Sequence, residues 1–225
     1  MRFSCCALIA LAGVALFGAE SGTVTLKAIP EAMRWSSPPA SFAVRGDNTI
    51  EIVSPRQTDW FISPLDGATR ANSPRLTFEV TGDFVLSARV TVDFQAKWDG
   101  GVLLAYEDET HWAKLCLENS VYEKPTIVSV VTRGASDDSN GVEVDGNSMF
   151  LQMARVGPAL VFYGSPDGHT WRIIRAFTLG DIATAGAHKL QLGFSSQSPT
   201  GPGHKTVFSN IQFRSQRPVD WWRGE

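Results

Sequence analysis

Cysteine is scarce in this chain, and its placement excludes an internal disulfide. The sequence has 225 residues and three cysteines, and two of them, Cys5 and Cys6, fall in an N-terminal apolar segment that we expect to be removed. Cys116 then remains alone, so no disulfide framework can stabilise the fold. Stability must come from a hydrophobic core instead, and about 205 residues suffice for one domain with such a core.

Long hydrophobic runs are also lacking. The longest, Cys5–Phe17, follows the early cation Arg2 and is shorter than the roughly 20 apolar residues that a membrane-spanning helix needs. A cation followed by a short apolar run is typical of a secretory signal peptide, which we place at Met1–Ala19. We therefore expect a secreted or periplasmic protein that has no membrane association after cleavage.

The chain has no block of one charge sign. Removing Met1–Ala19 takes away one cation and changes the formal net charge from −3 to −4. A mildly acidic chain without a basic patch is not typical of nucleic-acid-binding proteins. We expect no nucleic-acid partner, and the sequence leaves the oligomeric state open.

The residue patterns of common catalytic and metal sites are missing. The four histidines lack metal-ligand spacing, and there is no nucleophile elbow or phosphate-binding glycine loop. Glu143 and Asp145 share one face of an extended segment, but the second glutamate of retaining glucanases does not follow. The cluster Asp137–Gly141 offers hard oxygen ligands without EF-hand spacing. We predict no catalytic residues and no cofactor, with Ca²⁺ at this cluster as the alternative to an ordinary turn.

Strand-like segments are abundant, whereas sustained helical periodicity is not. The run Phe84–Phe94 alternates strictly, which predicts a half-buried strand. Similar runs recur about every ten residues along the second half of the chain, a spacing typical of antiparallel sandwiches. We predict an all-β fold, a two-sheet antiparallel jelly roll. Between the runs, Gly134–Asn147 is predicted to be a polar loop and Asp181–Gly186 to hold one helical turn.

The predicted organisation is a single domain after the signal peptide. Residues 20–57 are expected to supply edge strands of the same sandwich, and residues 58–216 its body. Residues 217–225, which contain Trp221 and Trp222, form a tail that either packs back on a sheet or protrudes.

The run His111–Glu118 presents two different faces. Ala113, Leu115 and Leu117 alternate with polar and aromatic residues, so one face is expected in the core and the other on a solvent-facing concave sheet. An indole offers a flat apolar surface to a sugar ring, while an ammonium and a carboxylate offer a donor and an acceptor to hydroxyls. The candidate ligand-binding residues are Trp112, Lys114 and Glu118, with Trp98 and Arg133 as neighbours.

A family resemblance rests on the same block. The motif H-W-A-K-L-C-L-E at His111–Glu118, followed by S-V-V-T-R, and the upstream T-G-D-F-V-L-S-A-R-V at Thr81–Val90 resemble the DUF1349 family. The resemblance covers roughly Asp59–Phe213 and implies a concanavalin A-like lectin/glucanase fold. That family usually continues with a Ser-Asp-Trp-type segment, whereas this chain has Gly134–Asp138 and lacks the tryptophan. Some members are labelled regulation of enolase proteins.

These observations favour a secreted, non-catalytic carbohydrate-binding domain. The alternatives are a glycan-active hydrolase or lyase of the same superfamily and a protein-interaction or regulatory domain. The hairpin Ser165–Trp171, S-P-D-G-H-T-W, is interpreted as turn chemistry anchored by its tryptophan, with a second sugar platform as the alternative.

Overall fold

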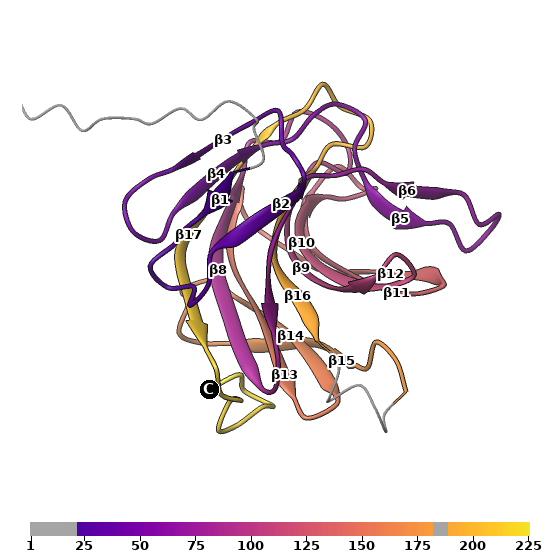
Figure 1. Ribbon diagram of the computed structural model, residues 1–225. Coiled ribbons are helices and arrows are strands. Elements are labelled where there is room, and N and C mark those ends of the chain that lie inside the picture. The colour runs from indigo at the N-terminus through magenta and orange to yellow at the C-terminus, as the bar shows by residue number, and fades with distance from the viewer. Residues whose placement is uncertain (1–21, 182–188) are drawn as a thin grey trace, which may run out of the picture.

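The fold is a two-sheet antiparallel sandwich, as predicted. The computed structural model describes residues 22–181 and 189–225, and within these ranges it contains strands and no helix (Figure 1). Two large sheets pack face to face, and every strand pair is antiparallel. Because the described residues contain no helix, none of them forms a helical membrane span.

The first sheet has eight strands. Its order is β1 (Thr23–Val24), β2 (Met33–Ser37), β7 (Arg75–Val80), β16 (Leu190–Gln197), β9 (Gly100–Asp108), β10 (His111–Asn119), β11 (Pro125–Arg133) and β12 (Ala135–Glu143).

The second sheet has seven strands, and a short hairpin stands apart from both sheets. The sheet order is β15 (Arg172–Phe177), β14 (Ala159–Ser165), β13 (Ser148–Val156), β8 (Phe84–Val92), β17 (Lys205–Arg214), β4 (Ile50–Val53) and β3 (Ser41–Val44). The hairpin pairs β5 (Trp60–Ile62) with β6 (Thr69–Ala71).

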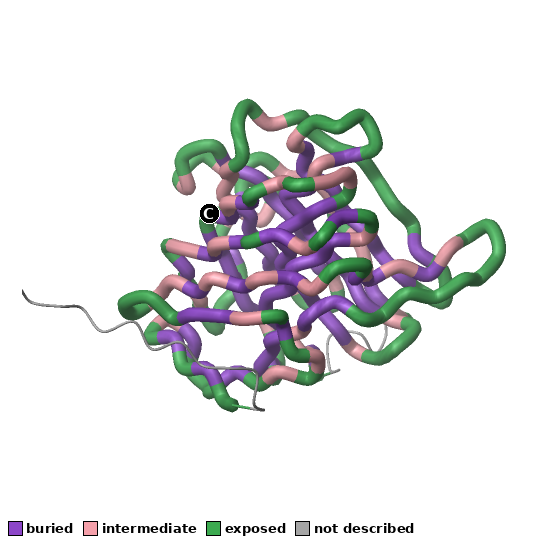
Figure 2. Tube along the Cα trace, turned by 90° about the horizontal axis from the view of Figure 1, so that it is seen from above, coloured by how far each residue is buried: buried purple, intermediate pink, exposed green. Residues whose placement is uncertain are grey.

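The core lies between the two sheets, where alternate residues of facing strands meet. Figure 2 shows buried residues gathered in the middle of the molecule and exposed residues around the loops. The alternation of β8 sends Phe84, Leu86 and Val90 into this core with no exposed surface. Phe94 lies beyond the end of β8 and is only partly buried. The central strands of both sheets are therefore fixed by apolar burial on their facing sides.

Residues 134–147 differ from the prediction. Most of this segment is strand β12, which pairs with β11 from Thr126 to Arg133. Its polar composition fits an edge strand, because only one of its sides joins the ladder and most of its residues are exposed. The helical turn predicted at 181–186 lies, except for its first residue, outside the described residues, as does the predicted signal peptide.

The C-terminal tail packs back on the outer face of the seven-stranded sheet. The Tyr163 hydroxyl donates to the Trp221 carbonyl at 2.5 Å, and Gln152 Nε2 donates to the Gly224 carbonyl at 2.9 Å. Gly224 has φ of +72°, and a Cβ at this position would lie 2.9 Å from Gln152 Nε2. The positive φ and this close approach both favour glycine at this position.

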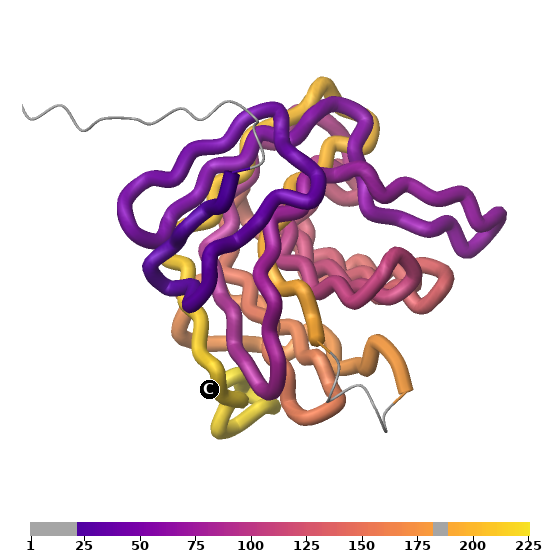
Figure 3. Tube along the Cα trace, in the orientation of Figure 1, coloured from indigo at the N-terminus to yellow at the C-terminus, as the bar shows by residue number. Residues whose placement is uncertain are grey.

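The β5–β6 hairpin covers part of the outer face of the eight-stranded sheet. Figure 3 shows it projecting over β9 to β12, on the side away from the core. The main-chain nitrogen of Ile62 donates to Ser136 Oγ at 2.9 Å, which ties the hairpin to β12. Because the hairpin covers this face, the candidate site residues on β10 are buried rather than exposed to solvent.

Candidate functional site

Strand β10 has the predicted alternation, but its outer face is not open to solvent. Ala113, Leu115 and Leu117 enter the main core. On the other face, Trp112 is 1% exposed, and Lys114 and Glu118 are also buried. The expectation of a solvent-facing strand is wrong because segments distant in the sequence cover this face.

An aromatic cluster covers the Trp112 end of the strand. Trp60 of β5 packs edge-on against Trp112, with ring centroids 6.0 Å apart, and against Tyr106 at 5.9 Å. We call the members at this end, Trp60, Ile62, Leu104, Tyr106, Trp112 and Val130, the aromatic plug; the same apolar cluster continues along the sheet through Val102, Cys116 and Val128, between Lys114 and Glu118. The Trp112 indole is therefore packed inside protein, and it cannot act as an exposed platform for a sugar ring.

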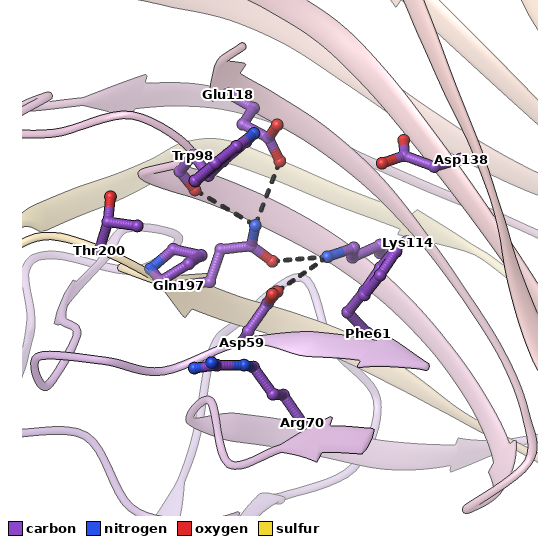
Figure 4. Close-up of a pocket in the computed structure, with 10 residues that line it drawn as sticks. Asp59, Phe61, Arg70, Trp98, Lys114, Glu118, Asp138, Gln197 and Thr200 are labelled. Carbon is purple, nitrogen blue, oxygen red and sulfur yellow. Dashed lines mark hydrogen bonds and ion pairs between the residues drawn. The ribbon is translucent and has the colours of Figure 1, made fainter. Parts of the chain in front are cut away.

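A pocket of about 360 Å³ lies at the Glu118 end of the same face. Its walls come from β5–β6, the loop before β9, strands β10, β12 and β16, and the loop that follows β16 (Figure 4). The lining residues are Asp59, Phe61, Arg70, Trp98, Lys114, Glu118, Asp138, Gln197, Pro199 and Thr200.

Four lining side chains form a continuous polar chain. Lys114 Nζ lies 3.3 Å from Asp59 Oδ1 and donates to Gln197 Oε1 at 2.8 Å. Gln197 Nε2 donates to Glu118 Oε2 at 3.1 Å and to the Trp98 carbonyl at 3.2 Å. The dashed lines of Figure 4 trace these contacts. We call this set, Asp59–Lys114–Gln197–Glu118, the polar chain.

Strand register explains how the polar chain is assembled. Glu118 of β10 stands opposite Gly100 of β9, which stands opposite Gln197 of β16. Because Gly100 has no side chain, the amide of Gln197 reaches across β9 to the carboxyl group of Glu118.

Burial sets the protonation of the pocket. Burial raises the pKa of Glu118 to about 8, although the nearby Lys114 ammonium opposes the rise. Burial also raises the pKa of Asp138, again against the effect of Lys114. Burial alone would lower the pKa of Lys114, but the surrounding acidic groups, Asp59 foremost, raise it. At neutral pH the pocket thus holds a charged ammonium beside a largely protonated Glu118.

Trp98 stands at the pocket rim in an uncommon backbone conformation. Its side chain lines the pocket, the residue is 38% exposed, and its φ is +66°. This left-handed conformation costs an L-residue about 1–2 kcal/mol. The loop around it supplies the compensation, because the carboxylate of buried Asp99 accepts hydrogen bonds from the main-chain nitrogens of Gln95 and Ala96, each at 2.8 Å, and from Ser198 Oγ at 2.7 Å. The loop therefore holds the backbone from which the indole projects in this conformation.

The structure brings together three of the five predicted site residues. Trp98, Lys114 and Glu118 line the pocket, whereas Trp112 lies in the aromatic plug and Arg133 is exposed at the last position of β11, outside the lining. Ligand binding by the first three stays a prediction.

The sequence interpretation missed most of the remaining lining. Asp59, Phe61 and Arg70 arrive with the β5–β6 hairpin, and Gln197 comes from a strand far along the chain. The sequence alone predicts a loop at Asp138. The strand alternation of β12 would have placed it on the outer face, two strands from Lys114, because both residues stand opposite Val130.

The polar side chains of two other sequence motifs make hydrogen bonds or ion pairs within the protein. In Asp137–Gly141, Asp137 pairs with Arg175 at 2.5 Å, and no group of three or more metal-ligating side chains gathers among the described residues. In the hairpin Ser165–Trp171, the Asp167 carboxylate accepts hydrogen bonds from the main-chain nitrogens of His169 and Thr170 at 2.8 and 2.7 Å. These bonds lower the pKa of Asp167 and give the motif its turn.

Comparison with known proteins establishes the family. Residues 35–216 match the family described as "Protein of unknown function (DUF1349)", and this chain belongs to it, as the motifs of β8, β10 and β11 indicate. No curated protein matches the chain.

Solved structures support the fold. A functionally unknown protein from Saccharomyces cerevisiae superposes with a TM-score of 0.71 at 21% identity, covering 83% of this chain and 96% of the other. The GH43 BlXynB protein from Bacillus licheniformis gives 0.57 at 13% identity, covering 81% of this chain and 36% of the other. The Bacteroides ovatus xyloglucan PUL GH43B gives 0.61 at 11% identity, with 84% and 38% covered. This chain thus spans little more than a third of these two GH43 proteins, and the likeness concerns the β-sandwich alone.

Proposed function

We propose that this protein binds carbohydrate in the pocket beside Trp98. The observation that carries the proposal is a partly exposed indole, on a hydrogen-bonded loop, that lines a pocket together with the polar chain. A sugar ring presents an apolar C–H face and a circumference of hydroxyls. A pocket that combines one aromatic face with a few convergent polar groups matches both features.

The polar chain can both donate hydrogen bonds to the hydroxyl groups of a sugar and accept hydrogen bonds from them. Lys114 has three N–H donors, and its contacts with Asp59 and Gln197 leave one for a ligand. The carboxyl group of Glu118 can donate when protonated, and that of Asp138 lines the same pocket as a further acceptor. Sugar hydroxyls both donate and accept, so they can enter this network without leaving a buried group unpaired.

A second candidate is a glycan-active enzyme. The specific observation in its favour is the raised pKa of Glu118, which keeps a carboxylic acid protonated near pH 7, in a pocket that also holds Asp59 and Asp138. Glycoside hydrolysis needs a general acid and a second carboxylate flanking the scissile bond. Release of reducing ends from a polysaccharide panel, lost in Glu118→Gln, would favour this candidate, whereas binding without release favours the binding domain.

Export forms part of the proposal. The apolar run Cys5–Phe17 after Arg2 supports cleavage near Ala19 and placement outside the cytoplasm, where polysaccharides are found. N-terminal sequencing of protein recovered from the medium or periplasm tests this, and an intact Met1 on cytoplasmic protein would contradict it.

Glycan binding is tested with a matched pair of tryptophan variants. Wild type, Trp98→Ala and Trp222→Ala are applied to a glycan array, and the best array glycan is titrated by calorimetry. Trp222 is more exposed than Trp98, at 63%, and belongs to the C-terminal tail. We expect Trp98→Ala to weaken binding at least about tenfold, or about 1.4 kcal/mol, and Trp222→Ala to bind as wild type does. Equal binding by all three proteins would place any glycan site elsewhere.

A further inference from the structure

The pocket is walled at its β16 side by the main chain itself. Residues Thr58 and Ser198 form an isolated antiparallel bridge, in which each main-chain nitrogen donates to the other residue's carbonyl at 3.1 Å. Thr58 Oγ1 accepts a further bond from the nitrogen of Ser198 at 3.2 Å. The segment that enters β5 is thereby fastened to the end of β16, next to the lining residues Asp59 and Gln197. The chain from Thr58 to Trp60 leads from this bridge to the aromatic plug, and it bounds the pocket on the β16 side.

The aromatic plug closes the pocket along β10. Lys114 lines the pocket, and Trp112, the next residue on the same face of the strand, already lies beneath Trp60. The plug is a packed apolar cluster, so a glycan cannot pass through it.

Two loops close the opposite end, beyond Glu118. The loop that carries Trp98 and the loop with Pro199 and Thr200 both line the pocket, and Thr200 Oγ1 donates to the Lys97 carbonyl at 2.8 Å. Asp99 and Ser198 join the same two loops deeper down. This wall is therefore held by hydrogen bonds rather than by contact alone.

The fourth side lies over the edge strand β12. Asp138 lines the pocket there, and Asn140, two residues further along the same face, is exposed, as is most of the strand. In Figure 4, Asp138 stands apart from the polar chain. Within residues 22–181 and 189–225, no hydrogen bond ties a covering segment to this part of β12 in the way that the hairpin is tied to Ser136.

We propose that the pocket binds the terminal residue of a glycan chain and that the rest of the chain leaves over β12 past Asn140. This inference rests on the proposed carbohydrate binding and specifies its mode. A groove that recognises internal segments must be open at two ends, whereas this pocket is walled on three sides. Its volume of about 360 Å³ is near the lower limit of ligand pockets, about 300 Å³, and suits a short terminal portion of a chain.

Chain-end recognition is tested by changing the number of ends at constant mass. Debranched xylan, linear mannan, amylose and mixed-linkage β-glucan are each partly hydrolysed to several mean lengths, and the full-length protein is titrated with equal masses of each preparation. For the polymers that bind, we expect the binding capacity per gram to rise in proportion to the number of chain ends. A capacity independent of the number of ends would overturn end recognition while leaving carbohydrate binding intact. Absence of binding to every preparation would overturn both proposals.

The exit over β12 is tested with a second matched pair. Asn140→Trp adds bulk on the outer face of β12, and Ser139→Trp adds it at the adjacent exposed position on the other face. We expect Asn140→Trp to weaken binding of the hexasaccharide from the best-binding polymer at least fivefold relative to its monosaccharide, and Ser139→Trp to leave this ratio unchanged. The same ratio in both variants would exclude an exit past Asn140.

Discussion

The two ends of strand β10 share one face and one alternation but have different surroundings. At one end Trp112 lies under Trp60 inside the aromatic plug. At the other, Glu118 lies in a pocket beside the exposed indole of Trp98. The difference comes from the β5–β6 hairpin, which places buried Trp60 and Ile62 over the first end and Asp59, Phe61 and Arg70 toward the second. The role of a strand face therefore depends on the segment that covers it.

The energetics of the two ends are also opposite. Burying Trp112 among apolar neighbours stabilises the fold, at roughly 25 cal/mol per Å² of apolar surface. Burying Lys114 with Asp59 removes charges from water, a cost that their attraction often fails to recover. A buried polar chain is thus a weak source of stability, and its arrangement around a pocket fits ligand binding better than it fits structural support. The predictions below separate these two roles.

The largest expected effect is on the pH dependence of stability at the Glu118 end. The unfolded carboxyl group ionises near 4.5, whereas the folded one holds its proton to about 8. Below pH 4.5 both states are protonated; as pH rises to 8 only the unfolded state releases the proton, so wild type loses stability over this range. At about 1.4 kcal/mol per pH unit the loss is at most about 5 kcal/mol.

Glu118→Gln removes this titration while keeping an acceptor for Gln197 Nε2. Urea unfolding at intervals from pH 4.5 to 9 should therefore show the variant gaining stability relative to wild type as pH rises. Ionisable groups far from Glu118 cancel in this difference, whereas Lys114, whose pKa Glu118 helps to raise, stays charged in both proteins over this pH range. Parallel profiles for the two proteins would mean that Glu118 is not held in its protonated form.

A second prediction concerns the Trp112 end. Trp112→Ala empties the centre of the aromatic plug and should lower the free energy of unfolding by about 3–5 kcal/mol, the usual loss for a buried large aromatic residue. Trp222→Ala removes an exposed ring that stacks on Trp221 at 3.9 Å, and it should lower the free energy of unfolding by no more than about 1.5 kcal/mol. Chemical denaturation measures both. A small effect of Trp112→Ala would show that the plug does not support the fold.

Strand β10 shows which features of the site could be predicted from the sequence and which could not. Period-two alternation predicted correctly which residues enter the core, because apolar burial between sheets acts on every second position. It could not predict that the other face is also covered, because Trp60 lies about 50 residues earlier in the chain and nothing local to β10 depends on it. Gln197 was missed for the same reason, since its contact with Glu118 depends on the order of β10, β9 and β16.

The β12 segment shows a different limit. Its residues Ala135–Glu143 are mostly polar, and polar runs are usually loops, yet they complete the edge of a sheet whose other strands are fixed by the core. Tertiary pairing overrides composition there. From its sequence context, therefore, Asp138 is predicted to lie in a possible Ca²⁺ loop rather than in the pocket.

The smallest expected effect on stability compares two replacements of Trp98. Trp98→Ala and Trp98→Gly both remove the indole, and both should lose glycan binding if the ring supplies the platform. They differ in the backbone, because alanine at φ of +66° keeps the left-handed strain and glycine does not. We expect Trp98→Gly to be more stable than Trp98→Ala by about 1 kcal/mol, after allowance for the greater freedom of glycine in the unfolded chain. Thermal and urea unfolding of the two variants, together with calorimetry against the best array glycan, give both readouts. If the glycine variant is the less stable, the loop around Asp99 does not hold Trp98 against strain. If either variant binds as wild type does, the platform is another residue, and the contrast between the two ends of β10 loses its functional meaning.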